Sequence, residues 1–290
     1  MQRPTAVLVA LTVAVLVTTG CSSSSPARRR ASAPSAPAGA GGGAAEPSES
    51  PEATATPTPD ATPTNPPTTK PPPKKNPPTG PRPPAGGSGP AGSTIVTGSN
   101  AVALTFDDGP DPNFTPRFLD LLKEQGVKAT FCLVGFRAAQ FPDLVRRIVA
   151  EGHTLCNHSW RHRFELGRLS PSEMELDLKR TNEAIHAAVP GAPIVYFRCP
   201  GGNFTAPLVA MARNMFGMKS IYWAVDPRDW EKAKFGSGPS MVNHIVSVVK
   251  TARPGSIVLS HDLAKPDTLA AYQQLLPWLK ARFTLIALPT

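Results

Sequence analysis

The chain has 290 residues and a formal net charge of +9, spread over two parts of different composition. Residues 1–93 carry 8 basic and 4 acidic residues, and residues 94–290 carry 22 and 17, so each part is only mildly positive. The second part has no basic cluster interleaved with aromatic residues, which argues against nucleic acid as a partner. This charge instead favours anionic cell-wall polymers or a membrane surface.

The N-terminus is typical of an export signal. Arg3 opens a short charged region, Ala6–Val17 is apolar, and Thr18-Thr19-Gly20 leads into Cys21. An apolar run this short predicts a signal peptide over residues 1–21 rather than a stable membrane span. The ending resembles a bacterial lipobox, which implies lipidation of Cys21, export, and a lipid anchor on the outer face of the cell membrane. Ordinary secretory cleavage is the alternative, because Thr18 departs from the usual leucine.

Residues 22–93 have the composition of a linker. They contain 19 of the 35 prolines and almost no large apolar residues, so they cannot bury enough surface to offset the entropy of ordering. We expect an extended, mobile tether of about 70 residues, which at polyproline rise spans roughly 200 Å. The remaining residues, 94–290, suffice for one domain with a single core, which we expect to be a monomer.

Short β-rich runs alternate with helical patterns in this domain. The runs are mostly continuous apolar stretches, as in parallel strands covered on both faces: Val102–Phe106, Val127–Val134, Thr154–Asn157, Ile194–Phe197, Ser220–Val225, Ile257–Ser260 and Phe283–Leu288. The helical patterns are Pro116–Gln125, Pro142–Ala150, Pro171–Val189, Ala206–Phe216, Ser240–Ala252 and Thr268–Arg282. A capping box, Ser170 followed by Glu173, opens the third of them. This alternation predicts an α/β fold, an incomplete (β/α)7 barrel. An open doubly wound sheet is disfavoured, because no glycine-rich dinucleotide fingerprint follows the first run.

Polar residues gather at the carboxyl ends of these runs. Asp107-Asp108-Gly109 follows the first run, His158 the third, Arg198 the fourth, Asp226 the fifth and His261-Asp262 the sixth. The carboxyl ends of barrel strands converge on one face, which carries the active site. These placements together predict a single site.

The residue types in this site suit metal-assisted hydrolysis. His158 and His162 are spaced i, i+4, and a helical turn after the third strand would bring both imidazoles to one face. Alone this spacing is weak evidence, but with an aspartate it becomes a common ligand set for zinc, which also suits cobalt or nickel. In the pair Asp107-Asp108 one carboxylate could bind the metal while the other accepts a proton from water. The sequence Asp-Asp-Gly-Pro-Asp is also strong turn chemistry.

Hydrolysis of an amide further needs an acid for the leaving nitrogen. His261 is the candidate, and a nearby carboxylate such as Asp229 would keep it protonated near neutral pH. Of the domain cysteines, Cys132 and Cys156 lie in successive strands, where a disulfide and two buried thiols are equally expected. Cys199 would then be unpaired, and nothing in the sequence places a base beside it for nucleophilic catalysis.

These residues fall into five ordered motifs that resemble the polysaccharide deacetylases of carbohydrate esterase family 4, the NodB-homology domain, over residues 95–290. Thr105-Phe106-Asp107-Asp108-Gly109 matches the first motif, which implies Asp107 as general base and Asp108 as metal ligand. His158-Ser159-Trp160-Arg161-His162 matches the second, which implies both histidines as ligands.

The other three motifs imply the rest of the site. Arg198-Cys199-Pro200-Gly201-Gly202 looks like the third, in which the arginine orients the base and the backbone after the proline helps to form the oxyanion hole. The family has an aromatic residue where this chain has Gly201, so we expect the groove wall of that residue to be lost. Asp226–Trp230 is similar to the fourth motif, which implies Asp229 as partner of the acid and Trp230 as a groove wall. Ile257–Asp262 matches the fifth, which implies Leu259 in the acetyl pocket and His261 as the acid.

The resemblance implies a metal-dependent hydrolase that removes N-acetyl groups from a cell-wall polysaccharide, peptidoglycan or a chitin-like polymer of N-acetylglucosamine. No catalytic position of the motifs is substituted, which argues against a pseudoenzyme. Two alternatives are an esterase that releases O-acetyl groups from xylan and a tethered glycan-binding module that has kept the fold.

Overall fold

The computed structural model describes residues 87–290. The predicted signal segment, Cys21 and most of the predicted linker lie outside the described residues. The end of that linker, residues 87–93, packs with the domain: a Cβ at Gly89 would lie 2.8 Å from Tyr222 Cβ, and Pro90–Gly92 contacts the helix Ala206–Phe216. No helix within the described residues is long and apolar enough to cross a membrane.

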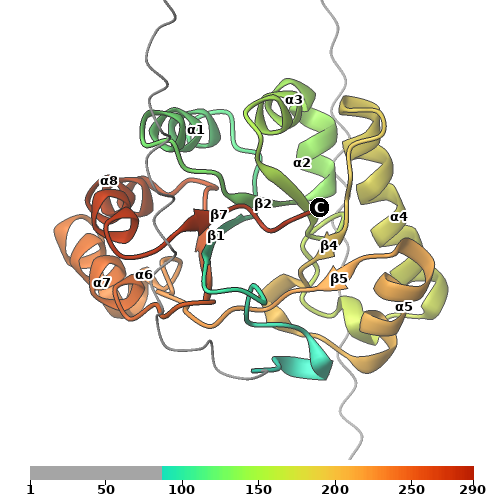
Figure 1. The fold of residues 1–290 in the computed structure, drawn as a ribbon. Coiled ribbons are helices and arrows are strands. Elements are labelled where there is room, and N and C mark those ends of the chain that lie inside the picture. The colour runs from blue at the N-terminus through green and yellow to red at the C-terminus, as the bar shows by residue number, and fades with distance from the viewer. Residues whose placement is uncertain (1–86) are drawn as a thin grey trace, which may run out of the picture. The chain divides into compact units, whose positions relative to one another are not determined.

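Within residues 87–290, seven parallel strands alternate with helices (Figure 1). The strands are β1 (Val102–Asp107), β2 (Thr130–Leu133), β3 (Thr154–Asn157), β4 (Tyr196–Phe197), β5 (Lys219–Ser220), β6 (Ile257–His261) and β7 (Leu285–Ile286). The α-helices are α1 (Thr115–Glu124), α2 (Gly135–Gln140), α3 (Pro142–Ala150), α4 (Pro171–Ala188), α5 (Ala206–Phe216), α6 (Lys232–Phe235), α7 (Pro239–Val249) and α8 (Pro266–Lys280). Short 3-10 helices are η1 (Pro90–Gly92), η2 (Leu166–Arg168) and η3 (Pro200–Gly202).

The strands form a curled sheet in the order β5-β4-β3-β2-β1-β6, and β7 pairs with the start of β1. Figure 1 shows the helices as an outer ring around these strands. A single parallel bridge, between Val225 and Val258, links the segment after β5 to β6 in the described structure. The predicted incomplete (β/α)7 barrel is therefore confirmed.

The fifth strand differs most from its predicted extent. The prediction was Ser220–Val225, whereas β5 ends at Ser220 and is followed by isolated bridges at Ile221 and Val225. The segment leaves β4 and crosses toward β6, so it cannot keep one continuous ladder. The short helices α2 and α6 were not predicted, since one or two turns contain too few residues to reveal a helical period.

Alternation along the strands directs polar side chains into the barrel. In β1, Ala103 belongs to a small apolar cluster inside the barrel, while its neighbours on either side pack toward the helices. Because successive side chains point to opposite faces, Thr105 and Asp107 share the inner side with Ala103. The same alternation in β6 places Leu259 and His261 inside. The end of each inner row is therefore where functional side chains can meet.

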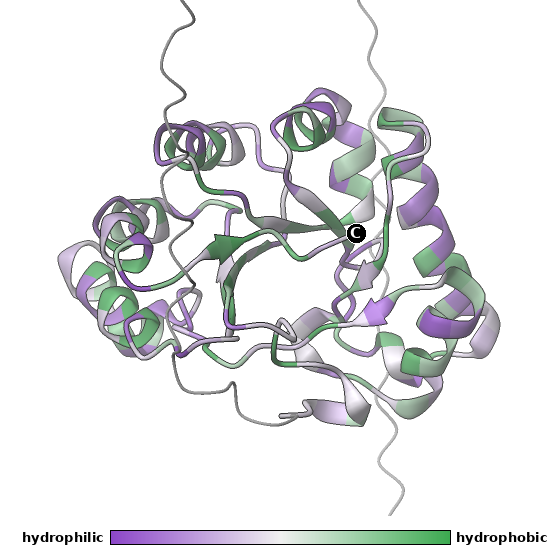
Figure 2. Ribbon diagram, in the orientation of Figure 1, coloured by the Kyte–Doolittle hydropathy of each residue, from purple (hydrophilic) through white to green (hydrophobic). Residues whose placement is uncertain are grey.

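Hydrophobic residues run along β1 and β2, and each outer helix carries both hydrophobic and hydrophilic residues (Figure 2). In α4 the predicted capping box is present, because Ser170 Oγ accepts from Glu173 N–H and Glu173 Oε2 accepts from Ser170 N–H. Leu178 and Ile185 of the same helix are buried in the core and lie two turns apart. The cap and the apolar stripe together fix this helix on the sheet.

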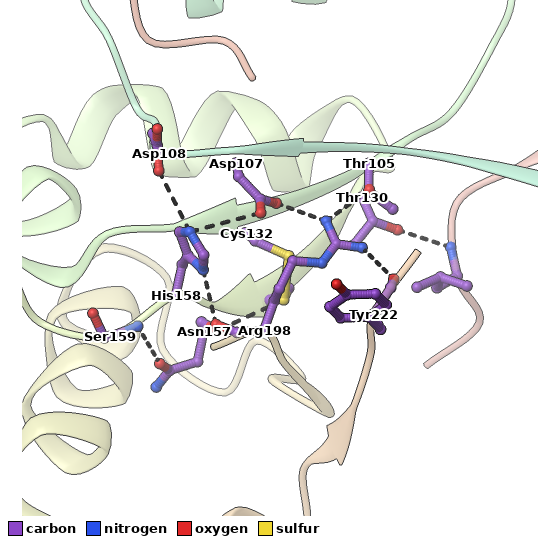
Figure 3. Close-up of a disulfide and its surroundings, with 12 residues drawn as sticks. Thr105, Asp107, Asp108, Thr130, Cys132, Asn157, His158, Ser159, Arg198 and Tyr222 are labelled. Carbon is purple, nitrogen blue, oxygen red and sulfur yellow. Dashed lines mark hydrogen bonds and ion pairs between the residues drawn. A yellow bond between two sulfur atoms is a disulfide. The ribbon is translucent and has the colours of Figure 1, made fainter. Parts of the chain in front are cut away.

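Cys132 and Cys156 lie opposite each other on β2 and β3 and form a disulfide inside the barrel (Figure 3). Cys199 is a buried free thiol, and burial raises its pKa to about 12. A thiol that stays protonated is a poor nucleophile, which agrees with the sequence argument against cysteine catalysis.

Candidate metal and catalytic site

The site begins at the end of β1, where the backbone turns sharply. Asp107 ends the strand and points inward, whereas Asp108 has a φ of 77°, in the left-handed region, which sends its side chain in another direction. Gly109 follows, and a Cβ at this position would lie 2.6 Å from both carboxylate oxygens of Asp262. The two neighbouring aspartates therefore present separate carboxylates, and the residue after them has to be glycine.

Asp108, His158 and His162 converge on one point. Their ligand atoms lie within 4.8 Å of one another, and Asp108 Oδ1 is 3.4 Å from His158 Nε2 and 3.2 Å from His162 Nε2. Asp108 Oδ1 is buried and accepts no hydrogen bond from the described residues. His158 Nδ1 donates to Arg198 O at 2.8 Å, which leaves Nε2 to face Asp108 (Figure 3). An unpartnered carboxylate oxygen facing two imidazole nitrogens fits a divalent metal.

The two histidines meet without the helical turn that their spacing predicted. The segment after β3 is not helical, and Ser159 and His162 have φ values of 66° and 54°. Asn157 Oδ1 accepts from Ser159 N–H at 2.9 Å, and Ser159 Oγ accepts from His162 N–H at 2.8 Å. These bonds stabilise the left-handed backbone conformation of Ser159 and His162. The two imidazole rings lie together as expected, but the predicted helical turn between them was wrong.

The protonation states of this cluster are set by mutual charge. Burial alone would raise the pKa of Asp108, but His158 and the charges of His261 and His162 hold it well below its usual range. Burial and the charge of His158 lower the pKa of His162. Burial opposes protonation of His158, whose pKa is nevertheless raised by Asp107 and Asp108. Ionised Asp108 attracts a positive charge, either a proton on His158 or a metal ion. A bound metal would therefore displace the proton of His158.

Arg198 holds Asp107 from behind. The Arg198 side chain is fully buried, and its Nη1 donates to Asp107 Oδ1 and Thr105 Oγ1, both at 2.7 Å (Figure 3). Its Nη2 donates to Tyr222 O at 3.0 Å. Asp107 Oδ2 is left facing the cluster, 3.6 Å from His158 Nε2. A fixed arginine thus commits one oxygen of Asp107 and leaves the other available.

His261 and Asp229 form a second buried pair. His261 Nδ1 is 2.6 Å from Asp229 Oδ1, and His261 N–H donates to Asp229 Oδ2 at 3.0 Å. Thr268 Oγ1 also donates to Oδ2 at 2.7 Å. Burial alone would lower the pKa of His261, but the charge and hydrogen bond of Asp229 raise it to about 9. His261 is therefore an imidazolium at neutral pH. Its Nδ1–H is bound to Asp229, which leaves Nε2–H free to donate a proton.

One pocket of about 370 Å³ unites these groups. Its lining includes eight of the residues predicted from the sequence, Asp107, Asp108, His158, His162, Gly201, Trp230, Leu259 and His261. Arg198 and Asp229 lie behind it, bonded to Asp107 and His261. The lining also includes Phe164, Cys199, Asn203, Trp223 and Asp226. The placement of Asp226 at the end of the fifth predicted strand had put it at this site without a role, whereas no role at the site was predicted for Phe164, Cys199, Asn203 or Trp223. For Phe164 the one available signal was an aromatic residue just after a ligand-like histidine.

Known proteins match this chain in sequence and in structure. The family model described as "Polysaccharide deacetylase" matches residues 95–220. A chitooligosaccharide deacetylase of Sinorhizobium fredii is 40% identical over 174 residues, which are 60% of this chain and 77% of that protein. The chain belongs to the polysaccharide deacetylase family. The resemblance that the five motifs indicated is thereby confirmed.

Two further known proteins are similar to this chain, one in sequence and one in structure. A peptidoglycan-N-acetylglucosamine deacetylase of Bacillus cereus is 38% identical over 183 residues, covering 62% of this chain and 81% of that protein. The solved structure of a family 4 carbohydrate esterase from Streptomyces lividans, in complex with acetate, has a TM-score of 0.57 and 34% identity. That match covers 65% of this chain and 92% of the esterase.

Proposed function

We propose that the protein is a metal-dependent N-deacetylase that removes acetyl groups from a cell-wall polymer of N-acetylglucosamine, peptidoglycan or a chitin-like chain. The observation that carries the proposal is that Asp107, held by Arg198, and His261, held by Asp229, line the same pocket as the metal-binding cluster. Relatives named chitooligosaccharide deacetylase and peptidoglycan-N-acetylglucosamine deacetylase support this substrate class.

Asp108, His158 and His162 would hold the metal. Zinc is the first choice for one carboxylate and two imidazoles, and the same donors suit cobalt or nickel. When bound, the metal supplies a Lewis acid that polarises the acetamide carbonyl and lowers the pKa of water.

Two residues of the chain then move protons. Asp107 Oδ2 accepts a proton from the attacking water, because Oδ1 is occupied by Arg198. His261 Nε2–H gives a proton to the departing amine, because Asp229 keeps the ring charged. Each proton-transfer group is thus oriented by a buried partner of opposite charge.

Other lining residues bind the substrate. Gly201 N–H donates to the negative charge that develops on the carbonyl oxygen, which is an oxyanion-hole role. Leu259 is buried at the pocket and offers an apolar wall to the acetyl methyl group. Trp230 is half exposed and offers its ring to the sugar. These roles complete a site for an N-acetylated glycan.

Acetate release tests the proposal. The zinc-loaded protein is incubated separately with chitooligosaccharides, peptidoglycan and acetylated xylan, with Asp107→Asn as a variant that keeps the ligand set. We expect acetate from a glucosamine polymer, loss of release in Asp107→Asn, and loss on chelation that zinc restores. Acetate from xylan alone would mean an O-acetyl esterase. Glycan binding without acetate from any of the three would mean a non-catalytic module.

We also propose, from the sequence alone, that the protein is exported and anchored by a lipid on Cys21, with the linker letting the domain reach the wall. Cys21 lies outside the described residues. Expression of the full chain and of Cys21→Ser in a bacterium that processes lipoproteins tests this. We expect the parent protein in the membrane fraction and the variant released. Equal distribution of the two proteins would rule out the anchor.

A further inference from the structure

Phe164 is an exposed aromatic residue at the mouth of the pocket. Its relative exposure is 59%, yet it lines the pocket beside the metal-binding cluster. The ring lies edge-on to His162, with centroids 5.1 Å apart. Its backbone is fastened as well, because Phe164 O accepts a hydrogen bond from Asn203 Nδ2 at 3.1 Å. An aromatic ring that lines a pocket and is left uncovered is available to contact a bound ligand.

Gly201 makes room for this ring. A Cβ on Gly201 would lie 2.7 Å from Phe164 Cδ1 and 2.8 Å from Phe164 Cε1, closer than side chains pack. The backbone of Gly201 also has a φ of 60°, which favours glycine. With the ring of Phe164 in this position, a side chain at position 201 would collide with it. The sequence predicted a missing groove wall at Gly201, and in the structure the ring of Phe164 lies against that position.

Trp230 exposes a second aromatic ring in the same pocket. Its relative exposure is 50%, and it directly follows Asp229, the partner of His261. Phe164 lies on the side of the ligand histidine His162, whereas Trp230 lies on the side of the acid. The two rings come from loops after different strands, β3 and β5. Two separate parts of the chain therefore supply exposed aromatic rings to the lining of one pocket.

We infer that Phe164 is a substrate-binding residue whose ring packs against the apolar face of a pyranose unit of the glycan. A pyranose ring presents axial C–H groups on its faces, and covering an exposed phenyl ring with them removes apolar surface from water. Gly201 is the complementary residue that leaves space for the ring. The inference rests on the proposed function, because it assigns a sugar contact to a site taken to act on glycans.

The test compares a glycan substrate with a small ester that has no pyranose unit to pack against Phe164. For the parent protein, Phe164→Ala and Phe164→Trp, kcat and KM are measured with N-acetylchitopentaose and with a small aryl acetate. Phe136→Ala is the matched control, since Phe136 is also exposed but does not line the pocket. Zinc content is measured for each protein, because the ring of Phe164 contacts a metal ligand.

We expect Phe164→Ala to raise KM for the pentasaccharide about fivefold to tenfold, as loss of one half-covered aromatic contact predicts. The ratio of pentasaccharide to aryl acetate kcat/KM should fall by the same factor, and Phe164→Trp should restore it. Phe136→Ala should keep the parent ratio. An unchanged ratio, or equal losses on both substrates with lost zinc, would overturn the inference. If the parent protein releases no acetate from glycans, the proposed function itself fails.

Discussion

Asp229→Asn tests how the buried pair keeps His261 protonated. The substitution preserves shape but removes the charge that raises the pKa of His261. The backbone N–H of His261 and Thr268 Oγ1 both point at Oδ2, so the amide oxygen takes that side. The amide nitrogen then faces His261 Nδ1, where an N–H donor favours the neutral ring. Because the charges of Asp107 and Asp108 remain and oppose the effect of burial, we expect the pKa of His261 to fall from about 9 to about its ordinary 6.5. That fall corresponds to a loss of about 3 kcal/mol in the stability of the imidazolium.

The effect on catalysis depends on pH in a defined direction. The acid works only when protonated, so the alkaline limb of the pH profile of kcat/KM moves down in the variant. At pH 6 the loss is about 1.3-fold, and at pH 8.5 it grows to about 75-fold, from the fractions protonated at the two pKa values. A bound divalent metal lowers the pKa of His261 in both proteins, so the difference between their profiles is the quantity to measure. Asp143→Asn, at an exposed surface position, is the control.

Stability should follow the same linkage. The folded pKa of His261 lies above the unfolded value, so its contribution is full below about pH 6.5 and is lost as pH rises through about 9. The difference in free energy of unfolding between the parent protein and Asp229→Asn should therefore be largest below about pH 6.5 and shrink as pH rises toward about 9. Denaturant titrations across pH measure it. Identical alkaline limbs in the two rate profiles would refute the assignment of His261 as an acid controlled by Asp229.

Further substitutions test the other residues that position the catalytic groups or stabilise the fold. Arg198→Lys keeps the buried charge but not the paired Nη donors, so kcat should fall about 100-fold through misplacement of the base, with KM little changed in steady-state assays. Replacing Cys132 and Cys156 together with alanine should lower the free energy of unfolding by about 3 kcal/mol, because the disulfide closes a loop of 24 residues; reducing agent should change the parent protein and not the variant. Gly109→Ala should destabilise the fold by about 2 kcal/mol or more, because its Cβ meets the buried Asp262 carboxylate; thermal unfolding checks this, and an unchanged Tm would contradict it.

The barrel was predictable because each strand and each long helix has a local sequence pattern, and the two patterns alternate along the domain. Each long helix occupies a segment with a helical pattern, and β3 and α3 have the predicted bounds. Ser220–Val225 was misjudged because propensity cannot tell a paired strand from a segment that crosses between two strands. Its residues pair with Thr94 and Val258, which lie far away in the sequence. The length of such a strand depends on pairing with distant segments, so it cannot be predicted from the local sequence pattern.

The meeting of His158 and His162 was predicted for a partly mistaken reason. Their spacing suggested a helical turn, but Ser159 and His162 adopt left-handed backbone conformations that propensity disfavours. Side-chain bonds from Asn157 and Ser159 stabilise that route. Non-glycine residues in this region are strained, and they persist where surrounding contacts determine them. The residue types at the site were therefore legible in the sequence, whereas the backbone that aims them was not.

Phe164 and Gly201 show why the wall of the pocket was harder to predict than its chemistry. A catalytic motif requires fixed residue types, because only certain groups bind a metal or move a proton. A wall requires only that some apolar ring occupy a place, and the chain can supply it from different segments. In this structure the ring comes from the loop of the second motif and occupies space beside the third. The absence of a side chain at Gly201 leaves the space that this ring occupies. We expect substrate preference to follow Phe164 and Gly201 as a pair, and not either residue alone.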